Sequence, residues 1–415
     1  MRVCVVGAGV VGVTSAYFLA REGHEVVLVD SRAYPAEVSS FANGGQLSYS
    51  YVAPLAGPGV LPSVPGWLLR SDSPLRFRPR LDPHQWRWCL QFALACRASV
   101  AQRSTAELQR LSYLSRDVMH RLLEQEPLAF GHLRNGKLIA YRSPELLDKA
   151  RKLVAYQAGL GAEQRVLDAR ETLALEPALA GMGASLAGAI YTPSEEAGDC
   201  RQFTQALFDR LGALDRVECR MSTEVLGLRT NGPVVTGVRT DAGDIGADAV
   251  VLATGVGSRA LLRPLGHDVP IYPLKGYSLS VPLSDDDDTA PRISVTDYER
   301  RIVYARVGRV LRIAAMVDIG SRDTGIDPAR VALLKRQVLE VFPHLDLSDA
   351  QPWAGLRPAT PTGKPLIGPV RGVDNLWLNI GQGALGFTLA CGSAALLTTR
   401  MSGVEPPIDD SPFLP

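Results

Sequence analysis

Apolar runs and a glycine-rich turn organise the first thirty residues of the chain. Residues 2–6 and 25–29 are apolar runs of strand length, and residues 13–21 between them read as a helix that stops at Gly23. Short apolar runs of this kind are typical of parallel strands that are buried on both faces. The pattern therefore predicts a strand, a helix and a second strand at the start of an α/β fold.

The rest of the chain alternates between helical and strand patterns. Within residues 85–125, Leu108 and Leu111 begin a leucine and valine series with the period of one helix face. Asp199 and Gln202 have the spacing of a capping box at a helix start. Helices are predicted at residues 85–125, 144–158, 199–211, 327–342 and 387–399. Strands are predicted at residues 136–141, 217–221, 224–229, 234–240, 248–255, 277–281, 301–307, 310–319 and 376–380.

One stretch, residues 54–83, interrupts this alternation with seven prolines and three glycines. Because proline removes backbone donors, we predict that no long helix or strand forms there. This stretch and the residues just after it carry Trp67, Trp86 and Trp88. The segment is a candidate lid or covering loop. Because tryptophan favours membrane interfaces, it is also a candidate membrane-docking surface. Ordinary packing of the tryptophans is the alternative explanation.

The composition is that of an ordinary globular enzyme. The 415 residues are 46% hydrophobic and 21% charged, with a net charge of +1. This charge balance lacks the excess of basic residues that is typical of nucleic-acid-binding proteins. The length allows two or three domains. The six cysteines form no C-x-x-C pair and no metal-like cluster with histidine. We therefore expect no metal site, no structural disulfide and a reducing compartment.

The sequence pattern contains neither a signal peptide nor a membrane span. The chain begins at once with the glycine-rich fold, and no apolar run approaches the roughly 20 residues that a bilayer requires. We expect a cytoplasmic protein, with peripheral contact to the inner face of the cell membrane left open.

The turn after the first strand has the spacing of a dinucleotide-binding motif. Gly7 allows a tight turn, Gly9 lets a pyrophosphate approach the backbone, and Gly12 lets helix and strand pack closely. The helix N-terminus offers free N–H groups and a partial positive charge to the phosphates. Asp30, at the end of the second strand, can accept hydrogen bonds from ribose hydroxyls. The motif predicts a dinucleotide and leaves nicotinamide and flavin both open.

Three later segments have small residues suited to a flat ligand. Residues 39–46 include paired glycines that allow close approach of the backbone, with a flexible loop as the alternative. The apolar strand at residues 248–255 ends in Ala-Thr-Gly, where the chain can turn beside a cofactor. A second glycine-rich turn, residues 381–386, opens a helix and would aim backbone N–H groups at an electron-rich acceptor.

Together these motifs resemble the D-amino-acid dehydrogenase branch of the FAD-dependent D-amino-acid oxidase and glycine oxidase superfamily. The resemblance rests on the glycine triplet with Asp30 and on residues 40–46, 273–279, 355–358 and 379–388, so it covers nearly the whole chain. It implies an α/β fold with a discontinuous Rossmann-type FAD-binding domain and a second α+β domain that contains a mixed or antiparallel sheet. The implied FAD-binding domain comprises residues 1–85, 195–262 and 350–415, and the substrate-binding domain comprises residues 86–194 and 263–349.

The resemblance also implies the cofactor and the residues near it. The ADP half of FAD would lie on the first glycine motif, and the flavin would lie near the later small-residue segments. The implied FAD-binding residues are Val3, Gly7, Gly9, Val10, Val11, Gly12, Asp30, Ser40, Asn43, Gly44, Gly45, Gln46, Ala253, Thr254, Gly255, Gly381, Gln382, Gly383, Leu385, Gly386 and Thr388.

Arg357 matches the arginine that grips the substrate carboxylate in related oxidases. A planar guanidinium can fix a carboxylate through two hydrogen bonds, and a structural ion pair is the alternative role. Tyr51 and Tyr277 are candidate active-site hydroxyls, each with packing as the alternative. Gln382 stands where many members of the branch have histidine. None of the six histidines lies in a matching motif, so no general base is assigned.

The implied activity is oxidation of a small-molecule D-amino acid by hydride transfer to the flavin. The products would be a 2-oxo acid and ammonia, or a cyclic imine from proline-like substrates, and a quinone or another carrier would take the electrons. A dehydrogenase for hydroxy-D-proline or another cyclic or N-methylated amino acid is a rival, as is an oxidase that forms peroxide. An alternative of a different functional class is a flavin-bearing subunit that needs partner proteins for turnover.

Overall fold

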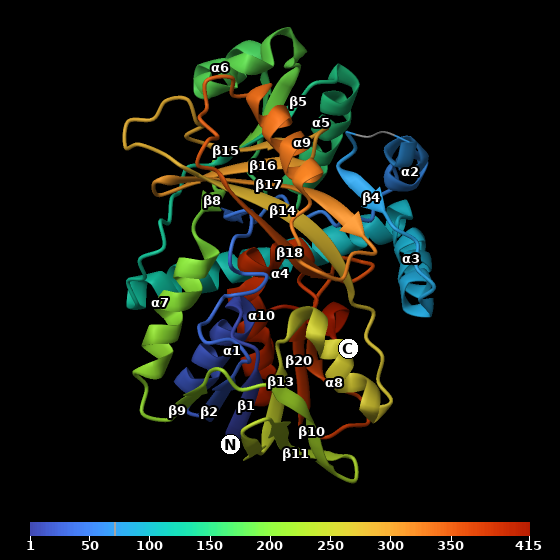
Figure 1. The fold of residues 1–415 in the computed structure, drawn as a ribbon, viewed down its shortest axis with the longest axis vertical. Coiled ribbons are helices and arrows are strands. Elements are labelled where there is room, and N and C mark those ends of the chain that lie inside the picture. The colour runs from blue at the N-terminus through green and yellow to red at the C-terminus, as the bar shows by residue number, and fades with distance from the viewer. Residues whose placement is uncertain (70–71) are drawn as a thin grey trace.

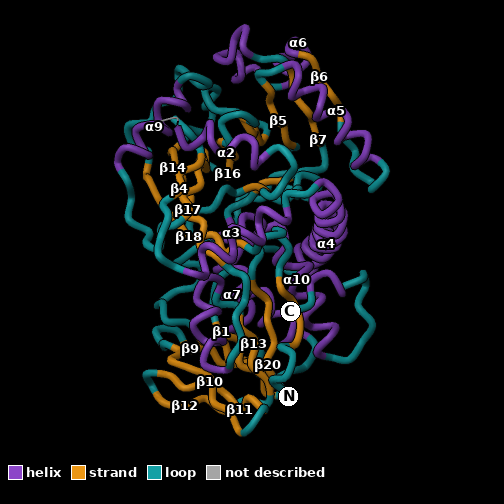
Figure 2. Tube along the Cα trace, turned by 90° about the vertical axis from the view of Figure 1, so that its right-hand side faces the viewer, coloured by secondary structure: helices purple, strands orange, loops and turns teal. Residues whose placement is uncertain are grey.

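The computed structural model describes residues 1–69 and 72–415, without the side chains of residues 67–69. Two sheets lie one above the other, and helices α4 (Ala98–Gln125) and α10 (Gly386–Met401) pass between them (Figures 1 and 2). A mixed α/β architecture with two sheet-based halves agrees with the expected fold class.

The lower half in Figure 1 is built on a six-stranded sheet in the order β19-β20-β13-β1-β2-β9. All neighbours are parallel except β19, which pairs with β20 in the antiparallel sense. Val3, Val5, Val27 and Val251 are fully buried, as expected for strands covered on both faces. The strands are β1 (Arg2–Val6), β2 (Glu25–Val29), β9 (Val217–Arg220), β13 (Ala249–Leu252), β19 (Leu366–Pro369) and β20 (Leu376–Ile380).

The upper half is built on a nine-stranded mixed sheet in the order β18-β14-β17-β16-β15-β5-β7-β6, with β4 also paired to β17. Most pairs are antiparallel, and β15–β5 and β17–β4 are parallel. The expectation of a mixed or antiparallel sheet is confirmed. The strands are β4 (Leu75–Phe77), β5 (Lys137–Tyr141), β6 (Arg165–Asp168), β7 (Gly188–Thr192), β14 (Tyr272–Pro282), β15 (Ser294–Asp297), β16 (Ile302–Val307), β17 (Val310–Ile319) and β18 (Gln351–Ala359).

The two faces of the nine-stranded sheet have different neighbours. On the face that we call the outer face, Leu279 and Ile313 share one apolar core with Leu334 of helix α9 (Pro328–Leu339). The inner face is turned toward the six-stranded half, and there Ser278 donates a hydrogen bond to the carbonyl of Ala42, 2.7 Å away. Successive residues of a strand point to opposite faces, so this division assigns each side chain to one environment.

Two smaller sheets and the remaining helices complete the fold. The sheets are β3 (Gln46–Leu47) with β8 (Glu196–Ala197), and β10 (Val225–Asn231) with β11 (Val234–Thr240) and β12 (Gly243–Gly246). The helices are α1 (Val10–Arg21), α2 (Val60–Leu69), α3 (Pro83–Ala95), α5 (Pro144–Ala158), α6 (Ala169–Leu175), α7 (Cys200–Gly212) and α8 (Ser258–Leu262). In the described part of the chain, no helix is both long enough and apolar enough to cross a membrane.

Predicted helix starts are confirmed where a side chain caps the first turn. Asp199 accepts a hydrogen bond from the N–H of Gln202 at 3.0 Å, and Ser143 accepts one from Leu146 at 3.2 Å. The helical region predicted at residues 85–125 consists of two helices, because Cys96 ends α3 and Arg97 adopts an extended conformation before α4.

The prediction of no long element in residues 54–83 needs correction, because α2 occupies ten of these residues. Pro62 lies in its first turn, where backbone N–H groups lack intrahelical partners anyway. Only Pro65 therefore removes an internal helical bond. Trp88 packs in the core and donates to the carbonyl of Ala359 at 2.9 Å, so packing explains it. The side chain of Trp67 lies outside the described residues.

The predicted division into two domains stays a proposal, and two strands qualify its boundaries. β4 and β18 fall in the ranges 1–85 and 350–415, which were assigned to the FAD-binding domain. Both strands belong to the nine-stranded sheet. The other strands of that sheet fall within 86–194 and 263–349, as expected.

Candidate active site

The first glycine turn has no room for a side chain at Gly7 or Gly12. Gly7 has a left-handed φ of 107°, and its N–H donates to the carbonyl of Val29 at 2.8 Å. A Cβ at Gly12 would fall 1.8 Å from the carbonyl oxygen of Gly7. Ser40 lies at the N-terminus of α1, where its Oγ accepts a hydrogen bond from the Val10 N–H at 3.1 Å. The turn thus brings residues predicted from two separate motifs together.

Asp30 fixes the same turn from the end of β2. One carboxylate oxygen accepts from the N–H of Ala8 at 2.6 Å, and the other accepts from the N–H of Arg32 at 2.8 Å. A carboxylate has about four acceptor positions, so capacity for a ribose hydroxyl is left.

The other two small-residue turns lie at the same sheet edge as the first. β20, β13 and β1 are consecutive parallel strands, so the turns that follow them meet there. A Cβ at Gly7 would lie 2.8 Å from the carbonyl of Ala253, and Gly255 has a φ of 54°. Gly381 has a φ of 87°, and Gln382 after it is buried with its amide 2.6 Å from Asn379 Oδ1. Gln382 therefore has a structural hydrogen bond in place of a titrating group.

Residues 42–48 connect this edge to the inner face of the nine-stranded sheet. A Cβ at Gly44 would lie 3.5 Å from Ala314, and one at Gly45 would lie 3.0 Å from Val307. The Ser48 N–H donates to Thr388 Oγ1 in the first turn of α10 at 3.3 Å. The 42–48 segment therefore lies between strands β16 and β17 on one side and the second glycine turn on the other.

Arg357 reaches this region from β18. It lies opposite Leu274 of β14 on the inner face, and its Nη1 donates to the carbonyl of Met316 at 2.9 Å. Among the described residues, it forms no ion pair with a carboxylate. Burial lowers the pKa of Arg357 to about 10, so the guanidinium stays charged at neutral pH. Arg357 is half-buried, and a cation removed from water without an anionic partner is costly unless a ligand supplies the charge.

Gly276 and Met316 place the Arg357 guanidinium. A Cβ at Gly276 would lie 2.3 to 2.4 Å from its atoms, so only glycine leaves room for it. The β14–β17 pairing shifts between Lys275 and Tyr277, and Met316 in the resulting bulge has a φ of 67°. A left-handed non-glycine residue costs about 1 kcal/mol and is found preferentially at functional sites. The sequence pattern gave no signal for this bulge.

The two predicted tyrosines are placed differently. Tyr277 belongs to the outer face, where its hydroxyl lies 3.4 Å from Asp318 Oδ2, so it is not brought together with Arg357. Tyr51 packs beside residues of the inner face, with the Lys137 ammonium 4.4 Å from its ring centre. Only Tyr51 is therefore left as a candidate on the side of the sheet that carries Arg357.

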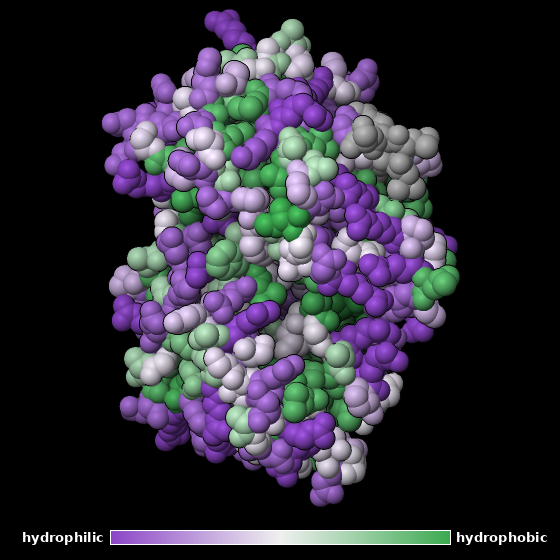
Figure 3. All heavy atoms as spheres, viewed as in Figure 1, coloured by the Kyte–Doolittle hydropathy of each residue, from purple (hydrophilic) through white to green (hydrophobic). Residues whose placement is uncertain are grey.

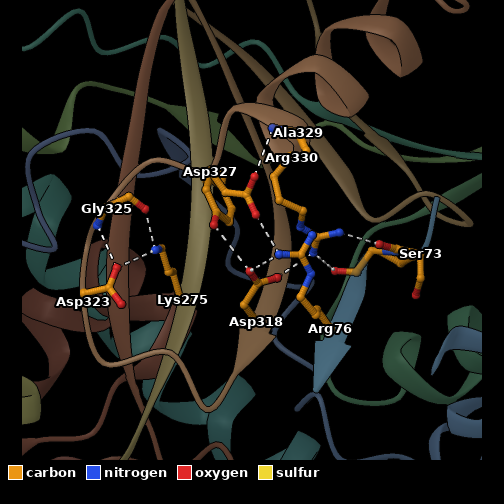
Figure 4. A network of polar contacts seen from close by, with 11 residues as sticks. Ser73, Arg76, Lys275, Asp318, Asp323, Gly325, Asp327, Ala329 and Arg330 are labelled. Atoms are coloured by element: carbon orange, nitrogen blue, oxygen red, sulfur yellow. Dashed lines mark hydrogen bonds and ion pairs between the residues drawn. The ribbon is translucent and has the colours of Figure 1, made fainter. Parts of the chain in front are cut away.

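A buried polar network lies behind Tyr277, on the outer face (Figure 4). Arg330 pairs with Asp318 at 2.7 Å, and both side chains are almost fully buried. Arg76 pairs with Asp327 at 2.7 Å, which ties β4 to the start of α9. Sequence reasoning missed this network, because its members are separated by up to 254 positions and form no local motif.

A comparison with known proteins identifies the family. The model of a family described as FAD dependent oxidoreductase matches residues 2–400. The chain belongs to this family. As an FAD-dependent oxidoreductase, it is similar to D-amino acid dehydrogenase 2 of Ralstonia nicotianae, at 53% identity over 100% of the chain and 99% of the relative. It is also similar to D-amino acid dehydrogenase 2 of Pseudomonas aeruginosa, at 50% identity over 100% of the chain and 98% of the relative.

Solved structures of the same fold are more distant in sequence. Glycine oxidase from Bacillus cereus aligns with a TM-score of 0.76 and 21% identity, over 99% of the chain and 97% of that structure. L-proline dehydrogenase from P. horikoshii aligns with a TM-score of 0.77 and 17% identity, over 98% and 95%. These likenesses support the fold.

FAD is the cofactor of this family, and the described residues fit it. The absence of a side chain at Gly12 lets the first turn of α1 pack closely against the glycine turn. The N-terminus of α1 can then bind phosphates. The α10 N-terminus lies at the same sheet edge, beside Thr388 and Ser48. We expect the glycine turn and Asp30 to hold the ADP half, and residues 43–46 and 381–388 to hold the flavin.

Proposed function

We propose that this chain oxidises D-amino acids and that Arg357 binds the substrate's α-carboxylate. The observation that carries this proposal is the half-buried guanidinium of Arg357, which contacts the Met316 carbonyl and has no carboxylate partner in the described structure. The dehydrogenases from Ralstonia and Pseudomonas support the D-amino acid class, because they match this chain over its whole length.

The protein's contribution to this reaction is orientation. Arg357 would hold the carboxylate through two hydrogen bonds and so fix the position of the Cα–H bond. When bound, FAD supplies the two-electron acceptor for the hydride that leaves Cα. The substrate amine loses its proton to solvent, and the imino product hydrolyses to a 2-oxo acid and ammonia or remains a cyclic imine.

A quinone or another carrier is the proposed electron acceptor, with α3 as the membrane contact. Trp86, Leu90 and Leu94 lie four residues apart on α3 and are 51%, 62% and 46% exposed. Leu81 just before the helix is fully exposed, and Arg97 just after it is also exposed. Figure 3 shows apolar atoms over α3 at the right-hand edge, among polar ones. An apolar helix stripe with basic neighbours suits an anionic lipid interface.

The test is a dye-reduction screen of D- and L-amino acids with the purified FAD-loaded chain. Reduction of the dye by D-amino acids, with little reduction by their L-enantiomers, is the expected result. No reduction by any D-amino acid would overturn the proposed function. Proline derivatives in the same panel test the rival activity on cyclic amino acids, and peroxide formation in air tests the oxidase alternative.

A further inference from the structure

A second arginine lies one strand away from the anchor of Arg357. Arg301 directly precedes β16, and in the β16–β17 pairing Val303 opposes Ala314. The pairing ends at this pair, and the same register extended by two residues places Arg301 beside Met316, whose carbonyl accepts a hydrogen bond from Arg357. Arg357 itself lies on β18, two strands further along the sheet, but its guanidinium reaches across β14 to the Met316 carbonyl on β17. Because neighbouring strands are about 4.8 Å apart, that guanidinium lies about one strand spacing from the start of β16.

The backbone of Arg301 is strained in the same way as that of Met316. Its φ is 56°, in the left-handed region that residues with a Cβ rarely adopt. Such a conformation costs about 1 kcal/mol and persists only where its surroundings hold it. The guanidinium carbon lies 4.6 Å from the ring centre of Tyr298, which fixes the side chain by a cation–π contact.

Two cations flank Tyr51 on this side of the sheet. The Lys137 ammonium lies 4.4 Å from its ring and donates to Ser48 Oγ at 2.8 Å. Burial raises the pKa of Tyr51, and the positive charge of Arg301 opposes that rise. Arg301 is therefore close enough to Tyr51 to act on its hydroxyl. Tyr51 thus lies between the Arg301 guanidinium and the 42–48 segment, in which Ser48 contacts Thr388.

The nearby carboxylates do not neutralise Arg301. Glu299 accepts from the N–H groups of Arg142 and Ser143 at 2.9 and 3.0 Å. Glu195 accepts from the N–H of Ser50 at 2.7 Å, and its other oxygen is buried without a hydrogen-bond partner. Within residues 1–69 and 72–415, Arg301 forms no ion pair with either. It is exposed to solvent, so an anionic ligand can reach it.

We propose that Arg301, with Tyr51, binds a carboxylate on the substrate's side chain. The favoured substrates are then D-amino acids with an acidic side chain, which place one carboxylate on Arg357 and the second on Arg301. Each guanidinium can take its carboxylate through two hydrogen bonds, which fixes both ends of a short dicarboxylate. This inference rests on the proposed function, because it assumes that Arg357 binds the α-carboxylate.

The test compares D-glutamate with D-alanine and D-norvaline in the FAD-loaded enzyme and in Arg301→Met. In the wild type, we expect kcat/KM to be higher for D-glutamate than for D-norvaline, which has a similar length and no charge. Arg301→Met should lower kcat/KM for D-glutamate about 30-fold, mainly through KM, because a hydrogen bond to a charged group is lost. Its activity on D-alanine should stay within about threefold, since D-alanine has no side-chain carboxylate.

Two further variants separate binding from folding. Arg301→Asn removes the charge and tolerates the left-handed conformation, so it should reproduce the loss for D-glutamate with a normal melting temperature. Arg309→Met removes an exposed arginine at the β16–β17 turn and should leave both activities unchanged. Equal losses for D-alanine and D-glutamate in both Arg301 variants would overturn the inference.

A binding measurement gives a readout without turnover. Glutarate and butyrate should both perturb the flavin absorbance, and glutarate should bind more tightly in the wild type. That advantage should vanish in Arg301→Met, whereas an unchanged advantage would overturn the inference. Oxidation of D-alanine but not of D-glutamate by the wild type would overturn the inference and leave the proposed function standing. Failure with every D-amino acid would overturn the proposed function itself.

Discussion

Two arginines on opposite faces of one sheet have opposite surroundings, and Arg330 is buried whereas Arg357 is half-buried. On the outer face, Arg330 lies 2.7 Å from Asp318, and that carboxylate also lies 3.9 Å from Arg76 (Figure 4). On the inner face, Arg357 has only a backbone carbonyl as its hydrogen-bond acceptor in the described structure. Burial lowers the pKa of both arginines, and only for Arg330 does a neighbouring carboxylate oppose that shift.

The difference separates a structural charge from a binding charge. The buried pair of Arg330 and Asp318 holds α9 and β17 together, and Arg76 joins β4 to it. Removing either member of the pair leaves a buried charge without its main partner. The unpaired arginine makes the folded protein less stable than it would be with an apolar residue, and that cost is recovered when a carboxylate binds. Three substitutions test this comparison and a fourth tests another buried charge, from the largest expected effect to the smallest.

Arg357→Met should have the largest effect, on catalysis. We expect kcat/KM for D-amino acids to fall about 1000-fold, or roughly 4 kcal/mol, since the α-carboxylate loses its charged partner. Most of the loss should be in KM. FAD should stay bound, as judged from the absorbance spectrum, and the melting temperature should not fall. Unchanged kinetics would contradict the carboxylate assignment.

Arg330→Met should act on stability instead. Asp318 would be left buried with only Arg76 nearby, so the free energy of unfolding should fall by about 3 kcal/mol. Denaturant unfolding of the FAD-loaded protein measures this loss. The kcat/KM of the folded fraction should stay within about threefold. A KM increase comparable to that of Arg357→Met would show that the two faces are not functionally separate.

Gly276→Ala should have an intermediate effect, through the position of Arg357. The new methyl group would lie within 2.4 Å of the guanidinium, which must then move. We expect KM to rise about 30-fold, or roughly 2 kcal/mol, with little change in FAD content. Gly308→Ala on the same sheet meets no atom within 4 Å and serves as a control for kinetics. A normal KM in Gly276→Ala would mean that Arg357 tolerates displacement.

Glu196→Gln should have the smallest effect, and one that depends on pH. Glu196 lies 2.6 Å from His120 Nε2 and 2.9 Å from His132 Nε2, and these contacts hold the pKa of its carboxyl below the usual value despite burial. A carboxyl group whose pKa is lower in the folded state stabilises the protein at pH values above its unfolded-state pKa. This stabilisation is lost as the pH falls through the folded-state pKa. The variant should therefore be less stable by about 1 kcal/mol at pH 7, with the difference closing below about pH 4.

Thermal unfolding at several pH values checks this last prediction. Tyr49 also contacts Glu196, at 3.2 Å, and the amide of glutamine keeps an acceptor for its hydroxyl. The substitution removes the charge and turns the oxygen facing one of the two histidines into an NH2 group. A stability difference that stays constant as the pH falls from 7 to well below about 4 would contradict an electrostatic role for Glu196.

The sequence was informative where local spacing determines structure. Gly7, Gly12 and Asp30 predicted the first turn, because that turn is built from residues close together in the chain. Helix starts such as Asp199 were predicted for the same reason. Arg357 was found through the motif that surrounds it, and its lack of a carboxylate partner became visible only in the fold.

Other features depend on which face of a strand meets which neighbour. Tyr277 is separated from Gly276 by one position, yet the two lie on opposite faces, and both faces of the sheet are covered. Periodicity alone cannot say which face carries the cofactor. The left-handed residues Met316 and Arg301 gave no signal either, since glycine is the residue that normally marks such backbone.

The order of strands in the six-stranded sheet has a consequence for synthesis on the ribosome. β1 begins at Arg2, whereas β20 and the buried helix α10 are not complete until Met401. Pairings between strands so distant in the chain form slowly and leave apolar surface exposed in the meantime. The first strands have their neighbours once β13 is made, but β13 lacks its partner β20, and α1 lacks the covering helix α10, until translation is almost over. In the proposed site, which uses both glycine turns, FAD loading would therefore follow translation.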